Sequence, residues 1–233
     1  MLLTRAPMLQ PDTGPQQPFL TRLHAEELAA LRSRAVPRQF ARGATIVHQG
    51  EVPGRVVVIE QGYAKVTAVT EDGKEVVLAF RGPGDVLGEL AALSALPRSA
   101  TVRSIEPIDA IAIAVDDFAA WLEQHPRVAL ELLKVVIERL READRQQFEF
   151  TAYQTLGRVA RRLVELAERF GEPSEGGVRI SLRISQEELA GWAGASREAT
   201  TKALHDLREM DLVDTERRRF TVRSVDRLKA LTG

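Results

Sequence analysis

Apolar residues follow two different periods along the chain, and each change of period marks a different part of the fold. From Phe19 to Arg34 leucines recur at three- and four-residue intervals, which indicates an amphipathic helix that Pro37 ends. From Phe40 apolar and polar residues alternate, as in strands. The predicted strands cover residues 45–50, 56–59, 63–70, 75–80, 100–105 and 108–115, with a hairpin turn at Glu71-Asp72-Gly73. Many short strands at even spacing predict a β-roll or barrel.

Helical periodicity returns at Asp116 and continues in a long helix that begins at Pro126 and extends to residue 152. Its apolar stripe is wider than packing on one barrel needs and contains Val128, Leu132, Leu133, Val136, Ile137 and Leu140. Leu133 and Leu140 lie seven residues apart, as in a coiled-coil seam. The stripe favours a dimer, although a helix buried in its own domain would show a similar pattern.

A second unit begins near Tyr153. The predicted order is helix 157–170, loop 171–177, strand 178–184, helix 186–192, helix 197–210, a hairpin of strands 213–215 and 220–223, and a short last helix. Ser185 and Glu188 form a capping box at the start of helix 186–192. Gly194 permits a sharp turn, and Ser196 caps the next helix. Two helices joined in this way are typical of a helix-turn-helix motif.

Composition indicates an ordinary two-domain protein. The chain has 233 residues, of which 44% are hydrophobic and 28% charged, and its formal net charge is −1. Residues 1–152 carry 17 basic and 20 acidic side chains, and the remainder carries 15 basic and 13 acidic ones. The second unit therefore has a positive net charge, which suits nucleic-acid binding. The absence of cysteine excludes disulfides and thiolate-held clusters. Neither a signal peptide nor a membrane span is visible, so we expect a cytoplasmic protein.

One stretch combines the residue types that hold a small phosphorylated ribose. The backbone at Gly88 can approach a ligand closely, because this residue has no Cβ. The Glu89 carboxylate accepts from a sugar hydroxyl, and the planar Arg98 fork matches a phosphate. The candidate ligand-binding residues are Gly88, Glu89, Leu90, Arg98, Ser99 and Ala100. This is the chemistry of a cyclic nucleotide pocket, whereas Glu89 and Arg98 alone could be a salt bridge that closes the barrel.

The stretch resembles the phosphate-binding cassette of the cyclic AMP receptor protein (Crp/Fnr) family of bacterial transcription regulators. The resemblance implies that Gly88 and Glu89 meet the ribose and that Arg98 and Ser99 meet the cyclic phosphate. It implies an α+β fold with a flexible tail (1–18), a cyclic nucleotide-binding β-roll (19–125), a dimerisation helix (126–152) and a winged helix-turn-helix domain (153–233). The implied ligand is cyclic AMP without a metal, and the implied partners are double-stranded DNA, a second copy and RNA polymerase.

The segment from Gly194 to Leu204 resembles the recognition helix of the same family nearly residue for residue. The candidate DNA-binding residues are Ser196, Arg197, Glu198, Thr201, Lys202 and Arg218. The resemblance implies that Arg197, Glu198 and Lys202 read bases, and a basic hairpin tip suits the phosphate backbone. A helix face and a hairpin tip that are charged only because they are exposed to solvent would contain the same residue types. Ala199 and Thr200 depart from the family, which often has a threonine and then an apolar residue.

The long helix departs from the family where well-studied members read the base of the ligand. Those members carry a hydroxyl residue followed by Ser or Asn, but this chain has Ala143 and Asp144. An ionised Asp144 could accept from the adenine amino group, and it fits the paired N–H donors of guanine better. It could equally be rotated into solvent. We therefore expect a cyclic AMP-type pocket with weakened or altered base selectivity.

The sequence contains no catalytic constellation, which predicts a binding protein rather than an enzyme. The four histidines, His24, His48, His125 and His205, never pair at metal-ligand spacing. One alternative is the same architecture responding to cyclic GMP, another nucleotide or haem, or binding DNA without a ligand. A cyclic nucleotide module of a kinase or channel is disfavoured, because kinase motifs and membrane segments are missing and a helix-turn-helix is present.

Overall fold

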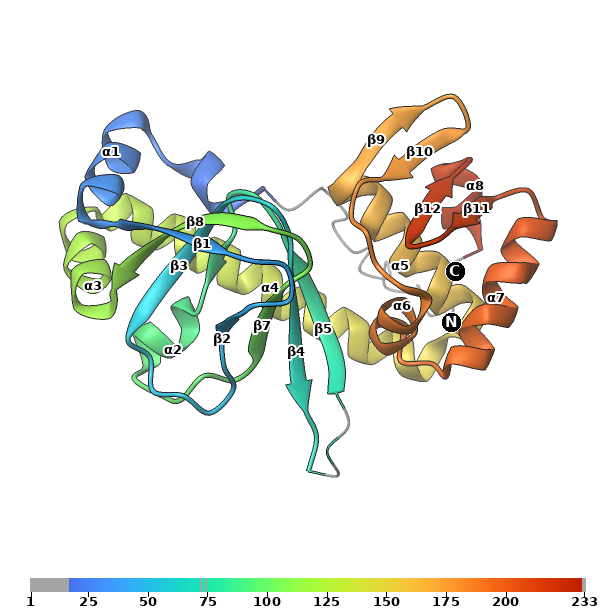
Figure 1. Cartoon of the computed structure of the whole chain (residues 1–233), viewed down its shortest axis with the longest axis horizontal. Helices are drawn as coiled ribbons and strands as arrows, with labels where there is room; N and C mark the ends of the chain where they lie inside the picture. The colour runs from blue at the N-terminus through green and yellow to red at the C-terminus, as the bar shows by residue number, and fades with distance from the viewer. Residues whose placement is uncertain (1–16, 72, 74, 232–233) are drawn as a thin grey trace, which may run out of the picture.

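The computed structural model describes residues 17–231 except 72 and 74, so most of the predicted tail and part of the predicted 71–73 turn lie outside the described residues. A β-rich unit and a smaller mixed unit lie side by side, and the long helix α4 runs behind both (Figure 1). The first unit contains η1 (Phe19–Arg22), α1 (Ala25–Arg34), β1 (Val36–Phe40), β2 (Thr45–Val47), β3 (Arg55–Gln61), β4 (Ala64–Val69), β5 (Glu75–Arg81), β6 (Val86–Leu87), α2 (Glu89–Ser94), β7 (Thr101–Ser104), β8 (Ile108–Ala114) and α3 (Val115–Gln124). The rest contains α4 (Pro126–Ala152), α5 (Thr155–Phe170), β9 (Gly171–Ser174), β10 (Gly177–Ile180), α6 (Gln186–Ala193), α7 (Arg197–Glu209), β11 (Val213–Glu216), β12 (Arg219–Val222) and α8 (Val225–Ala230).

The first unit is a roll of two four-stranded antiparallel sheets, which confirms the predicted α+β class. Their strand orders are β1-β8-β3-β6 and β2-β7-β4-β5. Strand β3 shows why the roll forms, because four consecutive residues, Val56 to Ile59, are fully buried. Val57 and Ile59 face the second sheet, whereas Val56 and Val58 pack under the helices. Alternate side chains of one strand thus pack into two different hydrophobic cores.

The predictions were wrong at two edge strands that each contain a proline. The helix ends before Pro37 as predicted, but no strand was predicted around this proline, which lies inside β1 and pairs with Ile111 of β8. The expected loop at residues 171–177 contains strand β9, where Pro173 pairs with Val178. Both strands lie at the edge of their sheets. A proline cannot donate to a ladder, and an edge strand tolerates this on its outer side. The expected helix at 19–34 is also interrupted, because His24 begins α1 as its N-cap.

The winged-helix unit shares a hydrophobic core with the roll. The Phe80 ring of β5 meets the Trp192 ring of α6 edge to face, with centroids 5.0 Å apart. Tyr63, before β4, meets Phe170 of α5 in the same way at 5.3 Å. Val77 of β5 belongs to the same buried cluster. Separating the two units would therefore expose large aromatic surfaces to water.

The chain turns sharply between α4 and α5, and one arginine spans the turn. Helix α4 ends before Tyr153, whose backbone is extended. The Arg158 side chain donates to the carbonyl oxygens of Tyr153 (2.7 Å), Ala193 (2.9 Å) and Gly194 (3.2 Å). Its guanidinium also lies 5.6 Å from the centre of the Phe150 ring, at the end of α4. The end of the long helix is thus linked directly to the turn before α7.

Candidate ligand pocket and DNA interface

Gly88 and Arg98 meet at the start of α2. The φ angle of Gly88 is +79°, a left-handed conformation that favours glycine, and an added Cβ would lie 2.0 Å from Nη1 of Arg98. The Arg98 guanidinium donates to the Gly88 carbonyl at 2.5 Å and to the Arg55 carbonyl. Only 6% of the Arg98 surface is exposed, and this burial lowers the pKa of its guanidinium. Two carbonyl bonds leave further N–H donors of the fork available for an anion.

Glu89 is held from the other side by a residue that the sequence analysis missed. Arg139 of α4 donates from Nη1 to Oε1 of Glu89 at 2.6 Å, and from Nη2 to the Val86 carbonyl at 2.9 Å. Glu89 is 2% exposed. Arg139 lies four residues after Val135, on the buried side of the helix, and that spacing was the available signal. The alternative to a pocket was a salt bridge between Glu89 and Arg98, but the structure pairs Glu89 with Arg139 instead.

The other predicted ligand residues differ in their exposure to solvent. Leu90 and Ser99 are exposed at the surface of the cassette, and Ala100 is half-buried beside Thr101. Asp144 is exposed on the outward side of α4, in line with Ile137 and Leu140. The structure therefore brings Gly88, Glu89 and Arg98 together, and it does not bring Asp144 to them within one chain.

The helix-turn-helix forms from the local signals that the sequence contains. The Ser185 hydroxyl accepts from the Glu188 N–H at 3.1 Å while the Glu188 carboxylate accepts from the Ser185 N–H at 2.8 Å. Gly194 has a φ of +58° at the end of α6, and Ser196 caps α7 by accepting from the Ala199 N–H at 3.1 Å. These caps fix where both helices begin.

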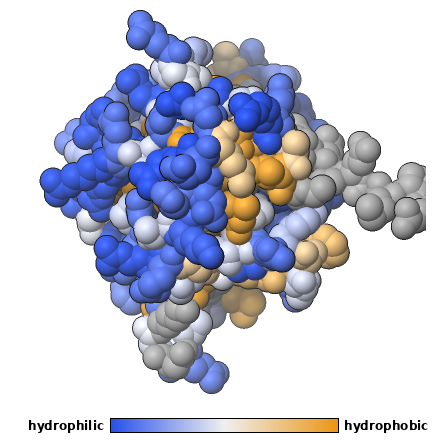
Figure 2. Space-filling model, turned by 90° about the vertical axis from the view of Figure 1, so that its right-hand side faces the viewer, coloured by the Kyte–Doolittle hydropathy of each residue, from blue (hydrophilic) through white to orange (hydrophobic). Residues whose placement is uncertain are grey.

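The predicted base-reading side chains share one open surface. Arg197, Glu198, Thr201 and Lys202 are all exposed on α7. Figure 2 faces this end of the molecule, where hydrophilic residues cover most of the surface. Bonds from its own backbone N–H and from the Ser196 hydroxyl lower the pKa of Glu198, which holds its carboxylate at the helix start. The Thr201 hydroxyl donates to Gln186 of α6 at 3.3 Å.

The tip of the β11–β12 hairpin presents Arg217 and Arg218 to solvent. Arg218 has a φ of +61°, so its backbone turns sharply at this point. Arg223, behind the tip, is paired with Asp211 and Asp214 at 2.8 Å each. The exposed tip therefore has cationic groups that the carboxylates behind it do not neutralise.

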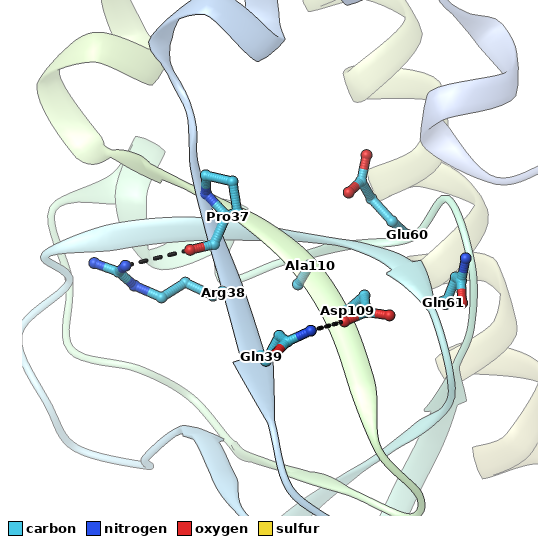
Figure 3. Close-up of a pocket in the computed structure, with 7 residues that line it drawn as sticks. All are labelled: Pro37, Arg38, Gln39, Glu60, Gln61, Asp109 and Ala110. Atoms are coloured by element: carbon cyan, nitrogen blue, oxygen red, sulfur yellow. Dashed lines mark hydrogen bonds between the residues drawn. The ribbon is translucent and has the colours of Figure 1, made fainter.

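Other surface features lie away from these sites. A polar depression of about 680 Å³ on the outer face of the roll is lined by residues of β1, β3 and β8, and Gln39 donates to Asp109 across it at 2.9 Å (Figure 3). His48 is exposed and contacts the Gln49 carbonyl. Within residues 17–231, leaving out 72 and 74, there is no cluster of His, Asp and Glu that could hold a metal. In the same part of the chain, every helix is too short or too polar to cross a bilayer.

Comparison with known proteins agrees with this geometry. Residues 37–125 match the cyclic nucleotide-binding domain family, and residues 157–231 match the Crp-like helix-turn-helix domain family. A CRP-like cAMP-activated global transcriptional regulator of Mycobacterium tuberculosis is 32% identical over 201 residues, which are 86% of this chain and 90% of the relative. The chain belongs to the Crp/Fnr family of transcription regulators.

Two further relatives of this Crp/Fnr regulator extend the comparison. The cyclic AMP receptor protein of Thermus thermophilus is 30% identical over 196 residues, which are 84% of this chain and 88% of that protein. The c-di-GMP responsive global regulator CLP of Xanthomonas campestris shares the fold with a TM-score of 0.74, at 20% identity, covering 86% of this chain and all of that one. The chain is thus a Crp/Fnr-type cyclic nucleotide-binding transcription regulator.

The departure at Thr200 has a visible effect on packing in this family member. Its side chain is fully buried, and its Oγ1 has no hydrogen-bond partner among the residues that the structure describes. A buried hydroxyl without a partner lowers stability by about 1–3 kcal/mol. Ala199, in contrast, is only half-buried and supplies the N–H that Ser196 caps.

Substituting Gly88 tests how closely Arg98 approaches the cassette. We expect Gly88→Ala to lower the free energy of unfolding by about 1–2 kcal/mol through its left-handed backbone and by about 1–3 kcal/mol more through the clash with Arg98. Gly43→Ala is the matched control, because Gly43 has a φ of +81° but no atom within 4 Å of an added Cβ. Urea denaturation measures both variants. Equal losses would contradict the close approach.

Proposed function

We propose that this regulator is a homodimer that binds cyclic AMP in the cassette and a palindromic promoter site through two copies of α7. The observation that carries the proposal is the meeting of Gly88, Glu89 and Arg98, in which both charged side chains are buried. Arg98 has free donors for a cyclic phosphate, and the two oxygens of Glu89 can hold Arg139 and a ribose hydroxyl together. Relatives named for cyclic AMP, at 30–32% identity, support this ligand.

The alternative is the same architecture with another ligand, such as cyclic GMP, another nucleotide or haem, or DNA binding without any ligand. A structural neighbour is described as responsive to c-di-GMP, so the fold alone leaves the ligand open. Haem finds less support, because His48 lies on the surface rather than in a cavity.

The dimer is supported by the outward face of α4. The residues of this face that are apolar and exposed are Leu130, Leu133, Ile137 and Leu140. Their spacing of three, four and three residues is that of a coiled-coil seam. An apolar groove of about 850 Å³ beside them extends the surface onto α2 and α3. A second copy packing along this seam would remove it from water.

Asp144 continues the same seam, four residues after Leu140. In a symmetric dimer the two Asp144 carboxylates would approach each other near the axis, where like charges repel. We infer that they meet the base of the bound nucleotide, which separates them and tightens the helix pair.

The remaining parts of the proposal follow from these sites. The protein works by binding rather than catalysis, in the cytoplasm, with RNA polymerase as a partner at promoters. Its functional units are residues 19–125 for the ligand, 126–152 for the dimer and 153–233 for DNA, with a tail at 1–18. Ser196 and Arg218 contact phosphates, and Arg197, Glu198, Thr201 and Lys202 face the base edges.

Removing the Arg98 fork tests the pocket. We expect Arg98→Ala to abolish measurable cyclic AMP binding with the fold retained, because a charged hydrogen bond in a desolvated site contributes roughly 1.5–3 kcal/mol. Isothermal titration calorimetry measures the affinity. Arg42→Ala, which changes an exposed arginine of the same unit, is the control and should bind as the parent does. An Arg98→Ala protein with parental affinity would contradict the pocket.

Exchanging Asp144 for a hydroxyl residue tests base reading. We expect Asp144→Ser to change the ratio of cyclic AMP to cyclic GMP affinity, because a carboxylate only accepts and a hydroxyl also donates. Gln147→Ser, at the next exposed seam position, is the control. If cyclic AMP binds the parent tightly and the ratio does not change, Asp144 has no role in recognising the base.

Two arginines separate base contacts from phosphate contacts. We expect Arg197→Ala to cost about 1–3 kcal/mol on inverted GTGA half-sites and to relax preference at one guanine. Arg218→Ala should weaken all sequences alike and reduce the salt slope by about 1. Fluorescence anisotropy at several salt concentrations distinguishes the two effects. A footprint with one asymmetric site would count against the dimer.

A further inference from the structure

The last turn of α4 is fixed on α5 by one buried carboxylate. Glu149 is 1% exposed, and one of its oxygens accepts from Nη2 of Arg162. The other oxygen lies 3.2 Å from Nη1 of Arg161. Both arginines belong to α5. Separating such a pair would leave a buried charge uncompensated, so this turn of α4 resists rotation against α5. The next residue, Phe150, is thereby held in a defined place.

The Phe150 ring lies against the turn that precedes the recognition helix α7. A Cβ added to Gly194 would lie 1.6 Å from Cε1 and 2.2 Å from Cζ of Phe150. Gly194 ends α6 with a φ of +58°. The end of α4 lies beside α6 and the start of α7 (Figure 1). The ring therefore occupies the space that a side chain at position 194 would take, and only glycine leaves that space free.

Arg158 links the ring to the turn. Its guanidinium lies 5.6 Å from the centre of the Phe150 ring, within the range of a cation–π contact. The same group donates to the carbonyl oxygens of Ala193 at 2.9 Å and Gly194 at 3.2 Å. A third bond, of 2.7 Å, reaches the Tyr153 carbonyl just after α4. We name Phe150, Arg158 and Gly194 the junction contact, because together they join the end of α4 to the backbone before α7.

The junction contact lies immediately before the predicted base-reading residues. Ser196, which caps α7, follows Gly194 by two residues, and Arg197 is the first residue of the helix. Leu204 and Leu207, on the inward side of α7, are buried in the same core as residues of α5. Helix α7 is thus packed on its own unit, and the junction contact helps to fix the angle between that unit and α4.

In a dimer this angle determines a distance. This step rests on the proposed homodimer, in which α4 pairs with its copy. The two copies of α7 then lie apart by an amount that depends on how each winged-helix unit is held against its own α4, and this separation sets the spacing of half-sites on DNA. Each base pair added between half-sites moves one of them by about 3.4 Å and turns it by about 35°, so spacing is a sensitive measure of the angle.

We propose that the junction contact determines which half-site spacing this regulator accepts, and that Phe150 is the positioning residue. The side chains of α7 select the bases, whereas Phe150 sets how far apart the two copies of α7 read them. The ring itself contacts no base in this role. The proposal goes beyond the proposed function, which assigns contacts to bases and phosphates but not the selection of the spacer.

Duplexes with inverted GTGA half-sites, whose spacer is shortened or lengthened one base pair at a time, test the proposal. Fluorescence anisotropy measures the affinity of the full-length protein for each duplex, with or without cyclic AMP, whichever gives tighter binding by the parent. We expect the parent to prefer one spacer. Phe150→Ala should reduce the preference over the neighbouring spacers by about two- to tenfold, the range that a contact of an aromatic ring supplies. Its affinity for a duplex with a single GTGA half-site should stay parental.

Two further variants sharpen the test. Met210→Ala is the matched control, because it removes a side chain of similar exposure, 42% against 47% for Phe150, at the far end of α7, and it should keep the parental preference. Gly194→Ala should relax the preference as Phe150→Ala does, since its Cβ displaces the ring. The double variant should show no further reduction, because both substitutions remove the same contact. Spacers are compared within each variant, so a change in half-site affinity cancels.

The possible failures are distinguishable. A Phe150→Ala protein with the parental spacing preference would overturn the proposal and leave the dimer untouched. Additive effects in the double variant would also overturn it. Sedimentation analysis that finds Phe150→Ala monomeric would do the same, because it would place Phe150 in the dimer seam rather than at the junction. A parent that binds all spacers alike would contradict the palindromic site of the proposed function together with this proposal.

Discussion

Helix α4 has to be buried along one side by two different neighbours, and the rest of the chain is arranged around that requirement. Its inward residues keep one heptad spacing, namely Val128, Leu132, Val135, Arg139, Glu142 and Glu149. The first three pack on the helices beside the roll, Arg139 reaches the cassette, and Glu149 pairs with Arg162 of α5. A single helix therefore contacts the ligand site and the DNA-binding unit through consecutive turns of the same face.

The change from apolar to charged residues along that face has a physical consequence. The apolar half is held by burial, which is insensitive to small changes of angle. The charged half is held by short directional bonds, and breaking one partner leaves a buried charge uncompensated. The contact with the roll is thus tolerant, whereas the contact with α5 has few acceptable geometries.

Local signals were sufficient to predict much of this structure. Pro126 and the extended Tyr153 mark the ends of α4, and the capping box at Ser185 begins α6 as predicted. Gly88 and Arg98 were found because a motif places them ten residues apart. Arg139 and its bond to Glu89 were missed, since that contact spans 50 residues and depends on packing. The partners of Glu149 were missed for the same reason. Two edge strands were missed because each of them contains a proline.

The aromatic contact between Phe80 and Trp192 limits how this architecture can be recombined. Both rings are almost completely buried and pack on each other across the two units, so neither surface is suited to water. A winged-helix unit taken from a relative would fit this roll only if it had an equally large apolar side chain at the position of Trp192. The roll and the winged-helix unit can therefore be exchanged between relatives only if the contacting surfaces of both units change together.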